Sequence, residues 1–234
     1  MQQGTPSALN GNGRCHLTYF AGRGLAQPLR YMLAACGISW EETHLKEPSQ
    51  IAALRAAGRL QFGQVPLLEL HGKDHVQSGA CLRYVDRAFG SGAKRTDAEQ
   101  YDVDAWADGA VDFYRVFTPL PFSGDASARA AYIENKIHAQ AVPRYIPTFE
   151  AQLAHTGGWL AGTPTPSHAD AALYAAVEFA VEVDVEITPQ TLPALSRWKS
   201  SFEALPGVAA YIGSKYHWGH PDEDYVSQVR SALA

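Results

Sequence analysis

The chain has 234 residues, of which 46% are hydrophobic and 18% are charged, and its formal net charge at pH 7 is −5. This length permits one large domain or two small ones, and the composition is that of a folded globular protein rather than a disordered one. The negative charge argues against nucleic acid or an anionic membrane as the main partner.

Residues 1–14 are polar and glycine-rich, and they do not resemble a secretory signal. No apolar run approaches the roughly 20 residues that a membrane-spanning helix needs. The three cysteines, Cys15, Cys36 and Cys81, form no CxxC pair, and isolated cysteines in odd number are typical of reduced thiols. We therefore expect a cytoplasmic protein.

The segment 15–91 alternates between strand and helix patterns. Alternating apolar and polar residues indicate strands, whereas apolar residues at a spacing of three and four indicate helices. Strands are expected at residues 16–20, 38–45, 65–70 and 75–76, and helices at 24–37, 48–58 and 78–89. The predicted order is βαβαββα, in which the first two strands are parallel and the last two form a hairpin.

After Gly90-Ser91-Gly92 the pattern changes to long helical stretches interrupted by prolines. This indicates an α/β domain at 15–91 followed by an all-helical domain at 97–218. Within the second domain, Ser167 and Asp170 have the spacing of a capping box, so we assign them to the start of a helix and not to chemistry.

Tyr19 ends the first expected strand, directly before the loop 21–24. Taken alone, it is an ordinary strand aromatic. A phenol there can also donate a hydrogen bond to a bound anion, and if that anion is a thiolate the bond lowers the pKa of the thiol. A shift of about two units, worth ~2.7 kcal/mol, would turn a thiol that is a few per cent ionised at neutral pH into one that is mostly ionised.

The segment 62–86 carries a second group of candidates. Val65-Pro66 enters an apolar run, and a cis bond there would leave the Val65 backbone free to pair with an extended peptide. Gln77 and Ser78 stand at the start of a helix, where Ser78 is the expected N-cap and backbone N–H groups suit a carboxylate. Separately these are a cap and a surface amide, but together they predict a docking edge for a peptide that ends in carboxylates.

Other polar residues give weaker signals. Trp40 and Arg55 can only donate hydrogen bonds, which suits them to a second carboxylate. Trp40 is explained equally well as a core aromatic residue, and Arg55 as a solvated charge on a helix. Asp104, Asp108 and Asp112 lie on one helix face, which is typical of a solvated face; one of them reaching an ammonium group across a subunit boundary is the alternative. Divalent metal on this stripe has less support, and no HExxH or Cys/His ligand spacing occurs, so we expect no metal.

With these residues assembled, the chain resembles the cytosolic glutathione S-transferase family over about residues 15–218. The resemblance lies in LTYFAGRGLAQPLRYMLAACGISWEE (17–42), FGQVPLLELHGK (62–73), VQSGACLRYVDR (76–87), WADGAVDFY (106–114) and WLAGTPTPSHADAALY (159–174). It is closest to the tyrosine-type alpha, mu, pi and sigma classes. It implies a thioredoxin-like N-terminal domain, a helical C-terminal domain, a homodimer and glutathione as co-substrate.

The resemblance also implies a role for each candidate residue. Tyr19 matches the tyrosine that hydrogen-bonds the glutathione sulfur. The remaining glutathione positions are matched by Trp40 and Arg55 for the glycyl carboxylate, Gln64, Val65 and Pro66 for the backbone contact, Gln77 and Ser78 for the γ-glutamyl carboxylate, and Asp112, or Asp108 one turn away, for the acid from the partner subunit.

Phe62 matches the aromatic key that enters the other subunit. Phe20, Gly22, Phe117 and Phe122 are expected to wall the cleft for the electrophile. Leu25 stands where alpha, pi and sigma members usually carry an arginine that supports the thiolate, so activation is expected to rest on Tyr19 and helix-end dipoles.

The leading hypothesis is a transferase in which a glutathione thiolate attacks a hydrophobic electrophile. A glutathione-dependent isomerase, as in sigma-like prostaglandin synthases, would instead return glutathione unchanged. A non-enzymatic carrier of hydrophobic ligands is the third alternative. A glutaredoxin-like enzyme needs a cysteine at the N-terminus of the first helix, and residues 21–27 contain none.

Overall fold

The computed structural model describes residues 15–233, so the expectation for residues 1–14 lies outside the described part. The strands are β1 (His16–Phe20), β2 (Glu41–Leu45), β3 (Leu67–Leu70) and β4 (Lys73–Val76). The helices are α1 (Gln27–Ala35), α2 (Pro48–Ala56), α3 (Ser78–Phe89), α4 (Asp97–Phe117), α5 (Ala126–Tyr132), α6 (Val142–Thr156), α7 (His168–Glu182), α8 (Pro193–Glu203), α9 (Pro206–Ile212) and α10 (Glu223–Leu233). Short 3-10 turns (Gly24–Ala26, Gly92–Lys94, Leu120–Phe122) and a π-helical segment (Ile133–Ala141) join them.

The four strands form one mixed sheet in the order β2-β1-β3-β4, with β1 and β2 parallel and the other pairs antiparallel. The predicted βαβαββα order and thioredoxin-like architecture are therefore confirmed. Element boundaries differ by a few residues: β2 begins at Glu41 instead of residue 38, and α1 begins at Gln27 because residues 24–26 form a 3-10 turn. The Val65-Pro66 bond is cis, and β3 begins directly after it.

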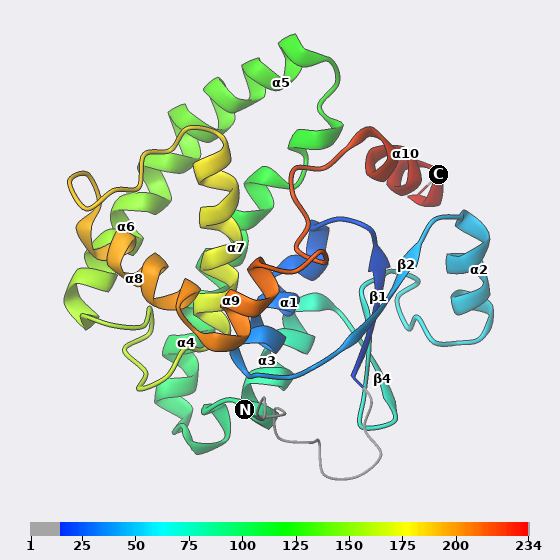
Figure 1. Ribbon diagram of the computed structural model, residues 1–234, viewed down its shortest axis with the longest axis horizontal. Coiled ribbons are helices and arrows are strands. Elements are labelled where there is room, and N and C mark those ends of the chain that lie inside the picture. The colour runs from blue at the N-terminus through cyan, green and yellow to red at the C-terminus, as the bar shows by residue number, and fades with distance from the viewer. Residues whose placement is uncertain (1–14, 234) are drawn as a thin grey trace, which may run out of the picture.

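Helices cover the sheet on both sides (Figure 1). Helices α1 and α3 lie between the sheet and the helical region, whereas α2 lies on the opposite side. Residues 27–34 of α1 are all buried, because α3, α7 and α9 pack against this helix and its Arg30 pairs with Glu42 of β2. Helix α1 is thus the core element that the two parts of the chain share.

The helical region begins with α4, and α4 packs along α7. The capping box at the start of α7 is confirmed: the Ser167 N–H donates to Asp170 Oδ2 at 2.8 Å, and the Ser167 hydroxyl accepts from the Ala169 N–H at 3.3 Å. Trp198 of α8 donates its indole N–H to Asp170 Oδ1 at 2.8 Å. This acid therefore holds two helices and not only its own first turn.

Helix α10 follows the last residue of the predicted helical domain, residue 218. It returns across the molecule to pack against α2 and the end of β1 (Figure 1). Between residues 15 and 233, none of the helices combines the length and apolar character that crossing a bilayer requires.

Candidate active site

The register of the sheet brings three of the predicted site segments to one end. Thr18 of β1 pairs with Leu67 of β3, and Leu67 pairs with Val76 of β4. Tyr19, Pro66 and Gln77 each follow or precede these residues by one position. They therefore lie next to one another at the same end of three neighbouring strands. None of the three segments indicates this grouping when it is taken alone.

The Tyr19 side chain is 6% exposed, and its hydroxyl oxygen accepts a hydrogen bond from the Leu25 N–H at 2.9 Å. The Arg30 guanidinium lies 6.0 Å from the centre of the Tyr19 ring. Burial raises the pKa of Tyr19, and the Leu25 N–H and Arg30 offset only part of this rise. The phenol therefore keeps its proton at neutral pH and is available as a donor.

The loop between β1 and α1 is held by buried polar contacts. Arg30 forms a two-pronged ion pair with Glu42, with both N–O distances 2.9 Å, and donates a further hydrogen bond to the Gly22 carbonyl at 2.7 Å. The Tyr114 hydroxyl of α4 donates to the Gly24 carbonyl at 2.6 Å. Gly24 has φ +37°, and a Cβ atom there would overlap the Tyr19 hydroxyl, so only glycine fits.

The start of α3 differs from the prediction by one position. Gln77, with φ +69°, is the N-cap residue, whereas Ser78 is the first residue of the helix and not its cap. Ser78 lines a cavity of about 380 Å³ together with Leu25 and Asp112. The cavity thus joins the first turn of α3 to Asp112 of the same chain, whereas the role expected for Asp112 is in the site of the partner subunit.

Arg55 lies on the exposed surface beside the loop that leads to the cis bond. Its Nε donates to the Gly63 carbonyl at 2.8 Å, next to Gln64 and Val65. Phe62, in the same loop, is 60% exposed.

Trp40 does not belong to this group, and its predicted role is corrected. Glu41, the next residue, pairs with His16, whereas Tyr19 pairs with His44, so Trp40 lies at the opposite end of the parallel pair from Tyr19. Its indole N–H donates to Glu42 at 2.8 Å, and its ring packs near Tyr211 around a separate cavity of about 630 Å³. Strand alternation alone could not reveal at which end of the sheet the indole would lie.

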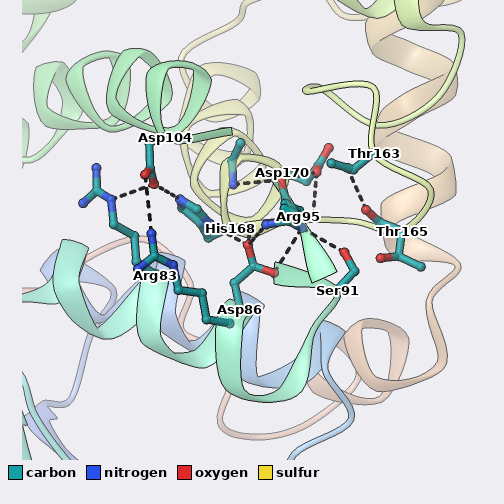
Figure 2. Close-up of polar contacts among 12 residues, drawn as sticks. Arg83, Asp86, Ser91, Arg95, Asp104, Thr163, Thr165, His168 and Asp170 are labelled. Carbon is teal, nitrogen blue, oxygen red and sulfur yellow. Dashed lines mark hydrogen bonds and ion pairs between the residues drawn. The ribbon is translucent and has the colours of Figure 1, made fainter. Parts of the chain in front are cut away.

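The acidic stripe of α4 is not simply a solvated face (Figure 2). Arg83 of α3 donates to Asp104 at 2.8 Å. It also donates to Asp108 at 2.5 Å. The His168 ring lies between Asp86, 2.7 Å from Nδ1, and Asp104, 3.0 Å from Nε2. These contacts attach α3 to α4 and α7. Within the stripe Asp104 is half-buried, whereas Asp108, although paired with Arg83, and Asp112 are both exposed.

Asp86 is the buried centre of this cluster. Arg95 donates to it at 2.6 Å, in addition to the contact with His168. Although burial acts in the other direction, these hydrogen bonds hold the pKa of Asp86 below its usual range. In residues 15–233 no group of three or more His, Cys, Asp or Glu side chains is arranged to hold a metal ion.

The predicted wall of the electrophile cleft is partly wrong. Phe117 is fully buried in the helical region, where it stacks on Phe179 with ring centres 5.8 Å apart, so it faces the core and not a cleft. Phe20, Gly22 and Phe122 do lie together, around the ring of Tyr225.

Tyr225 of α10 is a site residue that sequence reasoning missed. The sequence does indicate the start of a helix here. Asp222 is a suitable N-cap, acidic residues follow it, and the apolar residues Tyr225, Val226 and Val229 have helical spacing. In the structure Asp222 Oδ1 accepts from the Tyr225 N–H at 2.8 Å.

Comparisons with known proteins agree with this geometry. Residues 15–87 match the family model for the N-terminal domain of glutathione S-transferase, and residues 111–215 match a model for its C-terminal domain. The chain is 31% identical over 220 residues to glutathione S-transferase A4 of Mus musculus, covering 93% of this chain and 96% of that protein.

Two solved structures are similar in fold. A glutathione S-transferase from Ascaris lumbricoides has a TM-score of 0.73 at 25% identity and covers 91% of this chain and 100% of that one. Prostaglandin synthase D of Nilaparvata lugens has a TM-score of 0.70 at 25% identity and covers 86% and 98%. The chain therefore belongs to the glutathione S-transferase family.

Proposed function

We propose that this glutathione transferase forms its nucleophile at Tyr19. The observation that carries the proposal is a buried, protonated phenol at the edge where Pro66 and Gln77 also lie. Its hydroxyl would donate to the glutathione sulfur and favour the thiolate, because a hydrogen bond to the charged form lowers the pKa of a thiol. The thiolate would then attack a hydrophobic electrophile held beside it.

Glutathione would lie along the sheet edge with its two carboxylates at opposite ends. Gln77, Ser78 and the first N–H groups of α3 suit the γ-glutamyl carboxylate. The Val65 backbone, beside Gln64 and before Pro66, would pair with the middle of the tripeptide, and the exposed Arg55 suits the glycyl carboxylate. A Ser78→Ala variant that binds glutathione agarose as tightly as the wild type would contradict this placement.

We also propose a homodimer. In it, Asp112 of the partner subunit would reach the γ-glutamyl ammonium group, and the exposed Phe62 would be covered by the second subunit. Sedimentation should give twice the mass of a 25.4 kDa chain, and Phe62→Ser should shift the protein towards the monomer. Wild-type protein that sediments only as a monomer at micromolar concentration would rule this out.

Conjugation in the cytoplasm, as a detoxifying reaction, is the activity that we favour. Three free cysteines agree with a reducing compartment. The likeness to a prostaglandin synthase supports isomerisation as a second candidate. A panel of electrophiles, with free thiol measured after turnover, distinguishes the two: conjugation consumes one thiol per product, whereas isomerisation consumes none.

A further inference from the structure

The cavity beside Trp40 is large enough for a small molecule and lies apart from the glutathione site. Its volume is about 630 Å³, and ligand pockets in proteins range from about 300 to 1,000 Å³. Ala34 and Gly37, at the C-terminal end of α1, line this cavity. Tyr19 is hydrogen-bonded at the other end of the helix, and the nine residues between the two ends span about 13 Å.

Both regions of the chain contribute fixed walls to this cavity. Gly207 of α9 lines it, and a Cβ atom at Gly207 would overlap the Ala34 carbonyl oxygen. The backbones of α9 and α1 therefore touch, which only a glycine permits. Tyr211 of α9 is 5% exposed, and its ring centre lies 5.5 Å from that of Trp40. The cavity is therefore formed before any ligand arrives.

The aromatic residues of this wall are suited to a positive charge. Trp40 donates its indole N–H to Glu42 at 2.8 Å, so the ring is what it can offer to a ligand. Tyr216 also lines the cavity and is 48% exposed. The Lys215 ammonium lies over the Tyr216 ring, 5.1 Å from its centre. Aromatic rings attract cations in this geometry, and tryptophan does so most strongly.

The charges around the cavity favour a cation as well. Its lining includes the carboxylates of Glu41 and Glu42 and no basic side chain. Glu42 is neutralised by its ion pair with Arg30, whereas Glu41 is exposed and forms no ion pair with any residue of the described part. The C-terminal end of α1 adds the negative end of a helix dipole, with no basic residue in its last turn. Lys215 carries the opposing charge.

We propose that this cavity binds a hydrophobic organic cation, such as an aromatic quaternary ammonium compound. The apolar part of the ligand would lie against Ile38 and Tyr211, and its charge would lie near the Trp40 and Tyr216 rings with Glu41 as the counter-ion. An anion of the same size would meet the same apolar wall but would be repelled by Glu41. This site goes beyond the proposed transferase activity and does not depend on how the thiolate forms.

The test is an equilibrium titration of the full-length protein with two fluorescent dyes, the cation thioflavin T and the anion 1-anilinonaphthalene-8-sulfonate. Saturating S-hexylglutathione is present throughout, so that the glutathione site and the neighbouring cleft are occupied. The variants are Glu41→Gln, Tyr216→Leu and Lys215→Gln, all at exposed positions. Glu134→Gln is the matched control, because it removes an exposed carboxylate from the π-helical segment.

We expect one thioflavin T to bind per chain, with a lower Kd than that of the anionic dye. Glu41→Gln and Tyr216→Leu should each raise the Kd of thioflavin T about threefold. Lys215→Gln should lower it about twofold, because a like charge is lost and the Tyr216 ring is freed. Glu134→Gln should leave it unchanged.

Three results would overturn the proposal. The first is the absence of saturable thioflavin T binding when S-hexylglutathione is bound, since the dye would then have occupied the cleft. The second is a wild-type Kd for thioflavin T in Glu41→Gln. The third is a parallel response of both dyes to Glu41→Gln and Lys215→Gln, because the cavity would then select for apolar surface and not for charge.

Discussion

Replacing Tyr19 with phenylalanine tests the central chemical claim most directly. The substitution removes the hydroxyl that accepts from the Leu25 N–H at 2.9 Å and leaves the buried ring in place. A free thiol with a pKa of about 8.5 is about 3% ionised at pH 7, and a depression of about two units makes it about three-quarters ionised. We therefore expect kcat at pH 7 to fall by about 25-fold.

The pH dependence sharpens this prediction. In the variant, the midpoint of the kcat profile should move up by about two units, so that its turnover approaches that of the wild type above about pH 9. Binding should change little: by linkage, losing the pKa depression weakens glutathione affinity at pH 7 by only about fourfold. A general loss of structure would instead lower kcat at every pH.

The assay is steady-state conjugation at saturating glutathione across the pH range, with isothermal titration for the affinity and Tyr101→Phe as the control. A Tyr19→Phe enzyme with wild-type kcat and an unshifted profile would refute the reasoning. A loss of equal size at pH 7 and pH 9 would also refute it, because the hydroxyl would then not act through the protonation of the sulfur.

Three further outcomes follow from the contacts described above. Gly24→Ala should lower kcat more than tenfold, because its Cβ would displace the Tyr19 hydroxyl, and wild-type turnover would contradict this. Ser78→Ala should raise the KM for glutathione about tenfold, the loss of one hydrogen bond to a charged group, with kcat within about twofold. Asp86→Ala should lower the free energy of unfolding by about 3–5 kcal/mol, because it leaves His168 and Arg95 buried without their carboxylate. Since the folded pKa of Asp86 is depressed, its contribution is present above about pH 4 and is lost as the pH falls through the folded value, so denaturant midpoints of the wild type and Asp86→Ala should converge in acid.

Local patterns predicted the architecture and the residues whose place follows from a strand or helix end. Tyr19 is the last residue but one of β1, Pro66 directly precedes β3 and Gln77 directly follows β4, so their grouping follows once the order of strands is known. The capping box at Ser167 was predictable because both partners lie within four residues. The family and the fold were also predictable, because several distinctive segments occur in the right order.

The errors arose where position depends on contacts between distant segments. Trp40 lies on the predicted strand, but only the parallel register shows that it is at the far end from Tyr19. Phe117 is apolar and close in sequence to Phe122, which does lie near Tyr225. The direction that the Phe117 ring takes from α4 is decided by its packing on Phe179 of α7. Tyr225 is separated from Tyr19 by about the whole chain, and nothing local to residues 219–234 indicates where α10 docks.

The shared burial of α1 has a consequence for how the protein melts. Because α3 of the first region packs against this helix and α7 and α9 of the helical region also pack against it, unfolding either region exposes apolar side chains that the remaining region cannot cover. The two regions should therefore lose their structure together, in a single calorimetric peak. The site around Tyr19 would then have no stable partly folded state. Tyr114 and Tyr225, which contact the loop at Gly24, belong to the helices after residue 96, and these contacts are lost in the same unfolding transition.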